Sequence, residues 1–326
     1  MFIYYLMNDI VKLPLIDKYM PKNIASIILP DGIRTKILKC VDRKTIENTL
    51  LTGQNGVGKT LLMNIVSRTI LGPHFSKACY QLDTINNRGL KDLGVILPEF
   101  CDNYVPDFTG KKLILIDKVD NLTKKAQNLV ANIIDDYEDR ISFIMTCDNF
   151  KKVSSAIIEK CYFLSLTPIH PLKIQKRLEA ICIREEIYHT DDALKLISNI
   201  CNGDIRAAIN LLDNINNGYT IINVPNTQTL LYRPSHEEIK HFIQLCIDKQ
   251  TFSAIKFVKN LKQKGFCSTD ILLSIIDTIK FLKFDEDIRV NYTSIITEYY
   301  IRMSEELDTN LQMYACISKL VLYKNT

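Results

Sequence analysis

The feature that most constrains the fold is an eight-residue segment, Gly-Gln-Asn-Gly-Val-Gly-Lys-Thr, at residues 53–60. It matches the P-loop pattern and stands between a short apolar run and a segment with helical periodicity, the strand–loop–helix context that this motif requires. A glycine-rich turn that binds nothing is the alternative, but such a turn needs neither this spacing nor this context. We therefore predict a phosphate-binding loop formed by Gly53, Gln54, Asn55, Gly56, Val57, Gly58, Lys59 and Thr60.

The side chains at and beyond the end of this loop predict the ligand. In a P-loop the backbone N–H groups and the helix N-terminus point at phosphate oxygens. Lys59 is expected to reach the β- and γ-phosphates, and the Thr60 hydroxyl is expected to bind Mg²⁺. Asp117 ends a later buried run, where a second metal-holding side chain belongs, although an aspartate that merely caps the next turn is the alternative. The sequence thus predicts ATP and Mg²⁺ as cofactors, with Thr60 and Asp117 at the metal.

The first half of the chain alternates between strand-like and helix-like segments. Five short apolar, β-branched runs lie at 48–52, 79–83, 112–117, 141–147 and 161–167, and segments such as 59–71 and 124–137 between them have helical periodicity. This alternation predicts an α/β domain with a parallel sheet and helices on both faces.

After Pro168 the strand-like runs stop. Three amphipathic helices are predicted at 170–187, 190–203 and 204–215, and a polar stretch at 216–234 is the best candidate for a linker. From Ser235, which forms a capping box with Glu238, the chain reads as helical to near its end. We predict three domains: residues 1–167, nucleotide-binding; 168–226, small and helical; and 235–326, helical.

Composition excludes several classes of protein. The net charge is only +4, so no strongly basic or acidic block indicates a partner by charge alone. The ten cysteines are never closer than fourteen positions, which argues against a zinc ribbon and favours reduced thiols in an intracellular protein. No run of about eighteen apolar residues is present, so no membrane partner is expected. The abundance of Ile, Asn and Lys is typical of an AT-rich genome, such as that of a large DNA virus or a protist.

Beyond the P-loop, six further segments stand out, at 17–28, 82–90, 121–137, 143–153, 159–169 and 202–212. Their order and spacing resemble the small subunit of replication factor C, a clamp loader of the AAA+ ATPase family. The resemblance implies an AAA+ domain, a helical lid domain and a helical collar domain. It also implies that the chain binds ATP and helps to load a sliding clamp onto primed DNA during replication.

The same resemblance implies the partners and the location. The family works as a hetero-pentamer of clamp-loader subunits, which contacts the clamp and the junction of double- and single-stranded DNA. The expected location is intracellular, in the nucleus or, for a viral protein, at the viral replication site.

Three positions depart from the family pattern where catalysis takes place. Lys118 follows Asp117, where the family has the glutamate that deprotonates the attacking water. Lys160 replaces the arginine that the family projects into a neighbouring subunit's ATP site. At the sensor-1 position Asp148 stands where Asn is usual, so either Asn149 acts after a shift of one residue or the sensor is lost.

These departures predict weak or absent hydrolysis at the chain's own site. The loss of a general base commonly costs roughly 10²–10⁴ in rate, and lysine lacks the bidentate fork of arginine. We name Asp117, Lys118, Asn149 and Lys160 as the catalytic positions. Arg206 matches the family's sensor 2 and is expected to contact the γ-phosphate. In the alternative interpretation Lys118 pairs with Asp120 or Asp117, and Glu138 or another acid supplies the base.

Two further surfaces follow from the resemblance. Arg88 matches the residue that contacts a DNA phosphate in the family, and Lys91 lies one turn further on. The segment 91–100 resembles the clamp-facing helix, although an ordinary core face explains its apolar residues equally well.

Two other functions remain open. A branch-migration or initiator ATPase needs an intact acid after Asp117 and usually a basic recognition helix near its C-terminus. A structural adaptor that no longer binds nucleotide would not need Lys59 or Arg206.

Overall fold

The computed structural model describes residues 13–82, 84, 92–230, 234, 236–281, 286–305 and 309–323. It divides into two units, Met1–Ile222 and Asn223–Thr326, which are treated separately below.

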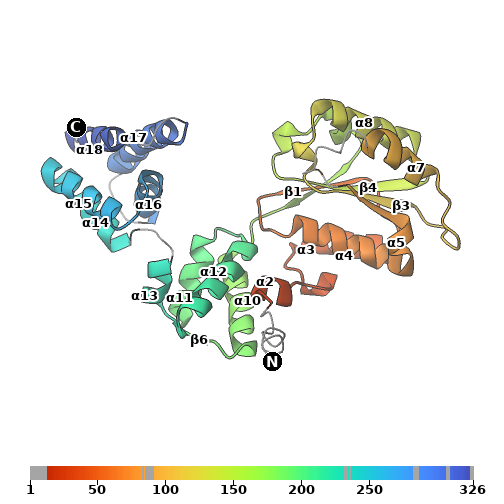
Figure 1. Cartoon of the computed structure of the whole chain (residues 1–326), viewed down its shortest axis with the longest axis horizontal. Coiled ribbons are helices and arrows are strands. Elements are labelled where there is room, and N and C mark those ends of the chain that lie inside the picture. The colour runs from red at the N-terminus through yellow and green to blue at the C-terminus, as the bar shows by residue number, and fades with distance from the viewer. Residues whose placement is uncertain are drawn as a thin grey trace, which may run out of the picture. The chain divides into compact units, whose positions relative to one another are not determined.

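A parallel five-stranded sheet forms the centre of the first unit (Figure 1). Its strands are β1 (Thr49–Gly53), β2 (Cys79–Leu82), β3 (Lys112–Ile116), β4 (Ile141–Cys147) and β5 (Tyr162–Leu166), in the spatial order β2-β3-β4-β1-β5. Each strand overlaps the run predicted for it, and every pairing is parallel, so the predicted fold class is confirmed. Because the strands are parallel, their carboxyl ends lie along one edge of the sheet, where ligands bind in folds of this type.

Alternating side chains of the strands form two cores, one on each face of the sheet. On one face Leu51, Leu115 and Ile144 pack against α3 (Asp31–Asp42) and α4 (Lys59–Leu71). On the other face Leu50, Ile116 and Phe143 pack against α7 (Leu97–Asp102) and α8 (Lys124–Asp136). Figure 1 shows α3 and α4 on one side of the sheet and α7 and α8 on the other. Shorter helical pieces of this part are α2 (Leu15–Lys18), η1 (Ile24–Ser26), η2 (Gly72–His74), α5 (Phe75–Ala78), η3 (Asp92–Ile96), η4 (Val119–Asn121), η5 (Phe150–Lys152) and α9 (Ser155–Ile158).

The three predicted helices after Pro168 are present as α10 (Pro171–Arg184), α11 (Asp191–Ile200) and α12 (Ile205–Gly218). Pro171 at the first position of α10 and the Asp204 carboxylate, which accepts the Ala207 N–H at 2.9 Å, define where two of these helices begin.

One expectation for this part was wrong. Strands do not stop at Pro168, because β6 (Tyr188–His189) and β7 (Ile221–Ile222) form a short parallel pair. The boundary between the two units falls within 216–234, where the linker was predicted, but this stretch also contains the end of α12, β7 and a helix, α13 (Val224–Leu230). Asn223 caps α13 by accepting the Asn226 N–H at 2.9 Å, a local hydrogen bond that the polar composition concealed.

The second unit, in the residues described, contains α13 and five longer helices: α14 (His236–Ile247), α15 (Thr251–Gln263), α16 (Ser268–Phe281), α17 (Glu286–Glu305) and α18 (Asn310–Leu322). These five helices share one apolar core, in which Ile243, Leu272, Ile296 and Ile317 are fully or almost fully buried. Among the described residues, no helix is both long and apolar enough to cross a membrane.

Candidate nucleotide-binding site

The predicted P-loop connects β1 to α4 at the carboxyl edge of the sheet. Two of its glycines are required by close contacts. A Cβ atom on Gly53 would lie 2.4 Å from the Leu166 carbonyl oxygen, so β1 could not approach β5 with any larger residue there. Gly56 has a φ of +73°, and a Cβ atom on it would lie 1.8 Å from Oδ1 of Asp204. The loop therefore touches the first turn of α12.

A cavity of about 590 Å³ opens over this loop. Three parts of the first unit line it: the segment around α2 and η1, the P-loop with the ends of β3 and β4, and the helices after Pro168. Its lining includes Asp17, Tyr19, Met20, Pro21, Ser26, Ile27, Ile28, Asn55, Gly56, Val57, Gly58, Lys59, Thr60, Asp117, Lys118, Asp148, Ile169, Arg177, Asp204 and Arg206. The volume suits a nucleotide-sized ligand.

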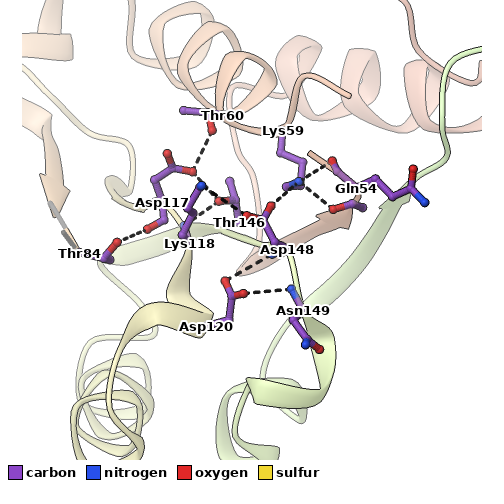
Figure 2. Close-up of polar contacts among 11 residues, drawn as sticks. Gln54, Lys59, Thr60, Thr84, Asp117, Lys118, Asp120, Thr146, Asp148 and Asn149 are labelled. Carbon is purple, nitrogen blue, oxygen red and sulfur yellow. Dashed lines mark hydrogen bonds and ion pairs between the residues drawn. The ribbon is translucent and has the colours of Figure 1, made fainter. Parts of the chain in front are cut away.

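The two residues predicted to hold Mg²⁺ lie side by side (Figure 2). The Thr60 hydroxyl donates to Oδ1 of Asp117 at 2.9 Å, and the Thr146 hydroxyl donates to the same oxygen at 2.5 Å. Among the described residues no group of three or more His, Cys, Asp or Glu side chains could hold a metal. Mg²⁺ commonly takes only one or two protein oxygens beside phosphate and water, so Thr60 and Asp117 fit such an ion.

The P-loop lysine is buried, with only 6% of its surface exposed. Its Nζ atom donates to the carbonyl oxygens of Gly53 and Gln54, both at 2.7 Å, and lies 2.7 Å from Oδ1 of Asp148. A protonated ammonium has three N–H donors. All three donors of Lys59 therefore have partners within the protein, and one of these partners is an anion.

The Asp148 carboxylate lies between the side chains of two lysines, as Figure 2 shows. Besides Lys59, it faces Lys118, whose Nζ atom is 3.4 Å from Oδ2. When the Asn55 amide is oriented with its nitrogen toward the carboxylate, it donates to both oxygens of Asp148, at 3.0 and 2.9 Å. Burial alone would raise the pKa of Asp148, but the hydrogen bond and charge of Lys59 and the charge of Lys118 outweigh it and hold the pKa below its usual value.

The backbone around Lys118 is held in an uncommon conformation. Lys118 has a φ of +55°, in the left-handed region that non-glycine residues rarely occupy. Its N–H donates to Oγ1 of Thr146 at 2.8 Å, and the Thr84 hydroxyl donates to the Asp117 carbonyl oxygen at 2.8 Å. These hydrogen bonds fix the direction in which the Lys118 side chain leaves the strand end.

The structure separates the two candidates for sensor 1. Asp148 lines the cavity, whereas the Asn149 side-chain oxygen accepts the Lys151 N–H at 3.1 Å and caps η5. The Asp120 carboxylate accepts the N–H groups of Asp148 and Asn149, at 3.3 and 3.0 Å, and so anchors this turn. Asp120 therefore contacts backbone at the turn after β4, and the ion pair of Lys118 is with Asp148.

The other predicted residues lie as follows. Arg206, the second residue of α12, lines the cavity and has no hydrogen-bond or ion-pair partner among the described residues, so its guanidinium is available to a ligand. Lys160 precedes β5 and forms an ion pair with Asp135 of α8. Arg88 and Lys91 lie outside the described residues. In the clamp-like segment Leu97 is buried, whereas Val95 and Ile96 are 59% and 42% exposed.

Several residues of the site were not recognised from the sequence. Thr146 contacts both Asp117 and the Lys118 backbone, and a polar residue near the carboxyl end of an apolar strand was the available signal. Arg177 and Asp204 come from the helices after Pro168, and Arg177 donates to the Tyr19 carbonyl oxygen at 2.8 Å. The spacing of the P-loop motif does not indicate that Arg177 and Asp204, more than 100 positions later in the sequence, line the same cavity.

Comparison with known proteins agrees with this geometry. The family described as ATPase family associated with various cellular activities (AAA) matches residues 49–167, and the replication factor C C-terminal domain matches residues 234–319. A putative replication factor C small subunit of Acanthamoeba polyphaga mimivirus is 29% identical over 95% of this chain and 97% of its own length. A replication factor C small subunit of Methanothermobacter thermautotrophicus is 26% identical over 94% and 97%.

Solved structures support the fold. A Thermotoga maritima RuvB Holliday junction branch migration motor matches with a TM-score of 0.54 and 17% identity, over 70% of this chain and 79% of that one. At this identity the likeness establishes the fold alone. The two family matches and the near full-length relatives agree with one another: along nearly its whole length the chain is similar to the replication factor C type of AAA+ proteins, and in particular to its small subunits.

Proposed function

We propose that the chain is a clamp-loader small subunit that binds ATP with Mg²⁺ and helps to load a sliding clamp onto primed DNA, with weak or absent hydrolysis at its own site. The observation that carries this proposal is that the residues for binding are present in the cavity, whereas the acid for hydrolysis is absent from its expected position. Lys59, Thr60 and Asp117 are in place for nucleotide and metal, whereas Lys118 occupies the place of the catalytic acid and pairs with Asp148. When bound, Mg²⁺ would neutralise phosphate charge beside Thr60 and Asp117.

Among the residues that the structure describes, no acid at the cavity is well placed to replace the missing general base. Among the described residues, Asp17, Asp117, Asp148 and Asp204 line the cavity. Asp117 accepts two hydroxyl hydrogen bonds, Asp148 is ion-paired and Asp204 caps α12. Asp17 belongs to α2, which lies outside the strand ends that carry the metal residues.

Glu138 does not fill this role either. It is exposed in the turn that precedes β4, at the amino edge of the sheet, whereas the P-loop and Asp117 are at the carboxyl edge. The whole length of β4 (Ile141–Cys147) separates Glu138 from the cavity. The Glu138 carboxylate therefore cannot reach a proton on a water molecule that attacks the nucleotide.

The proposed partners rest on the family and on two surface features. The relatives are named as subunits, which supports assembly with other clamp-loader subunits in a hetero-pentamer. The exposed Val95 and Ile96 support a docking site for a sliding clamp. The partner of Lys160, Asp135, is exposed, so solvent or a neighbouring subunit can compete for this ion pair. The predicted phosphate contacts of Arg88 and Lys91 would give salt-dependent binding to a primed DNA junction. The proposed location is the nucleus or, for a viral protein, the viral replication site.

The test is paired measurement of ATP binding and single-turnover hydrolysis on the purified full-length chain, alone and assembled with its partner subunits. We expect ATP to bind at micromolar strength and turnover in the isolated chain to be near background. Lys59→Ala serves as the variant with weakened nucleotide binding. Rapid hydrolysis by the unaltered chain alone would show that another residue is the base. Absence of ATP binding would instead favour the structural adaptor.

A further inference from the structure

We infer that the Asp148 carboxylate is a built-in competitor for the terminal phosphate of ATP, and that this residue makes the site favour ADP over ATP. The inference rests on the proposed function, because it concerns the selectivity of the same nucleotide site. It concerns binding rather than hydrolysis, and it follows from the contacts that Asp148 makes in the structure.

The first step concerns what Lys59 binds. In a P-loop the backbone N–H groups hold the α- and β-phosphates, and the lysine reaches the β- and γ-phosphates. Here the third donor of Lys59 is directed at Oδ1 of Asp148, at 2.7 Å. An oxygen anion of the protein thus occupies the position on this ammonium that a phosphate oxygen would take.

The second step concerns how firmly this anion is held. Three side chains surround it: Lys59, Lys118 and Asn55. Its backbone is anchored as well, because Asp120 accepts the N–H groups of Asp148 and Asn149. The backbone at the end of β4 is therefore anchored, and the carboxylate must give up three side-chain partners before it can turn toward solvent.

The third step compares the two nucleotides. ADP places its phosphates on the backbone of the loop, and Arg206 and the Thr60 hydroxyl remain accessible to it from the cavity. ATP brings one further phosphate, and with it one more negative charge, to the neighbourhood of Lys59, where it must displace a carboxylate or lie beside it. Two anions side by side in a partly desolvated site repel each other strongly unless a cation separates them. Because Lys59 also reaches the β-phosphate, ADP bears part of this cost, but the cost is larger for ATP.

Lys118 limits this cost. Its ammonium is 3.4 Å from Oδ2 of Asp148, on the side of the carboxylate away from the contact with Lys59. When a phosphate oxygen replaces Asp148 on the Lys59 ammonium, Asp148 can keep its ion pair with Lys118. ATP binding is therefore weakened without being abolished. The lysine in the place of the catalytic acid and the aspartate at the sensor position thus act as a pair.

The test is calorimetric titration of the full-length chain with Mg·ATP and with Mg·ADP. We expect ADP to bind at least as tightly as ATP to the unaltered chain. In Asp148→Asn, which has the same shape without the charge, ATP affinity should rise about tenfold or more and ADP affinity should change by less than about threefold. Asp148→Glu, which keeps the charge, should keep the preference for ADP.

Asp136→Asn is the matched control. It makes the same chemical change at the exposed end of α8, at the opposite edge of the sheet, and should leave both affinities unaltered. ADP binding also reports that each variant is folded. An unchanged ratio of ATP to ADP affinity in Asp148→Asn, with ATP binding intact, would overturn this inference and leave the proposed function standing. Failure of both nucleotides to bind to every form would overturn the proposed function itself, and this inference with it.

Discussion

Two halves of the same cavity differ in how many residues of the family pattern they retain. In the half formed by the P-loop and the end of β3, Lys59, Thr60 and Asp117 match what nucleotide and Mg²⁺ binding require, and their side chains converge. In the half formed by Lys118 and Asp148, each residue carries a charge that differs from the family pattern, and the two charges face each other at 3.4 Å. The difference teaches that, in the proposed function, nucleotide binding and hydrolysis rest on separate residues. The two halves meet at Asp148, which contacts both Lys118 and the binding residue Lys59.

The largest expected effect comes from reversing both changes together. Lys118→Glu alone would place a second carboxylate beside Asp148, and two like charges at this distance raise the pKa of at least one of them. The double variant Lys118→Glu/Asp148→Asn removes this conflict and should raise the single-turnover rate of the subunit, in its assembly with partners, by roughly 10²–10⁴. The single variant should gain much less. Equal rates in the two variants would contradict the coupling of these positions.

The next largest effect is expected on nucleotide affinity, in the half of the cavity that contains Lys59. Lys59→Ala should weaken Mg·ATP and Mg·ADP binding by up to about 100-fold, because hydrogen bonds to a charged group are worth about 1.5–3 kcal/mol. Equilibrium titration measures this loss. Lys160→Ala, which changes a lysine far from the P-loop that pairs with Asp135, is the control and should leave the affinity of the isolated chain unaltered. A retained affinity in Lys59→Ala would show that the nucleotide does not use this ammonium.

A smaller effect should separate the metal from the phosphates. Thr60→Val removes one hydroxyl beside Asp117 and should lower ATP affinity by about tenfold in the presence of Mg²⁺, and much less when EDTA is present. Thr69→Val is the matched control, because the Thr69 hydroxyl donates only to the Ile65 carbonyl oxygen within α4. A loss of equal size with and without Mg²⁺ would mean that Thr60 contacts the nucleotide directly.

The smallest effect concerns Lys160, which is proposed to reach the ATP site of a neighbouring subunit. The ion pair of Lys160 with Asp135 lies at the surface, and exposed pairs of this kind contribute about 0–1 kcal/mol. Asp135→Asn should therefore change the free energy of unfolding, measured with urea, by less than about 1 kcal/mol. A larger loss would indicate that Lys160 is a structural residue of this chain and not one that is free to reach a neighbour.

The sequence predicted the sheet well because each strand is a short apolar run between clear helical segments. It also placed Lys59, Thr60 and Asp117, since motif spacing and the end of a strand are local properties. It could not choose between Asp148 and Asn149, because one residue of shift at a strand end decides which side chain enters the cavity. The pairing of Lys118 was also missed, since the interpretation considered only its neighbours in sequence and the true partner lies on the adjacent strand, 30 positions away.

Contacts between distant segments account for most of the remainder. The contributions of Arg177 and Asp204 depend on how the helices after Pro168 pack over the P-loop, which no periodicity reveals. The short pairing of β6 with β7 was missed because two-residue strands carry too little pattern to be recognised.

The contact between Gly56 and Asp204 has a mechanical consequence. The loop that would cradle phosphate leaves no room for a methyl group between Gly56 and the Asp204 carboxylate, which caps the helix that carries Arg206. A shift of this loop toward α12 would therefore displace that cap, one residue before the helix begins. Such a link between the loop and the helix cap needs only occupancy of the site and no bond cleavage. Under the function proposed above, it would let the start of α12 respond to whether the site is full.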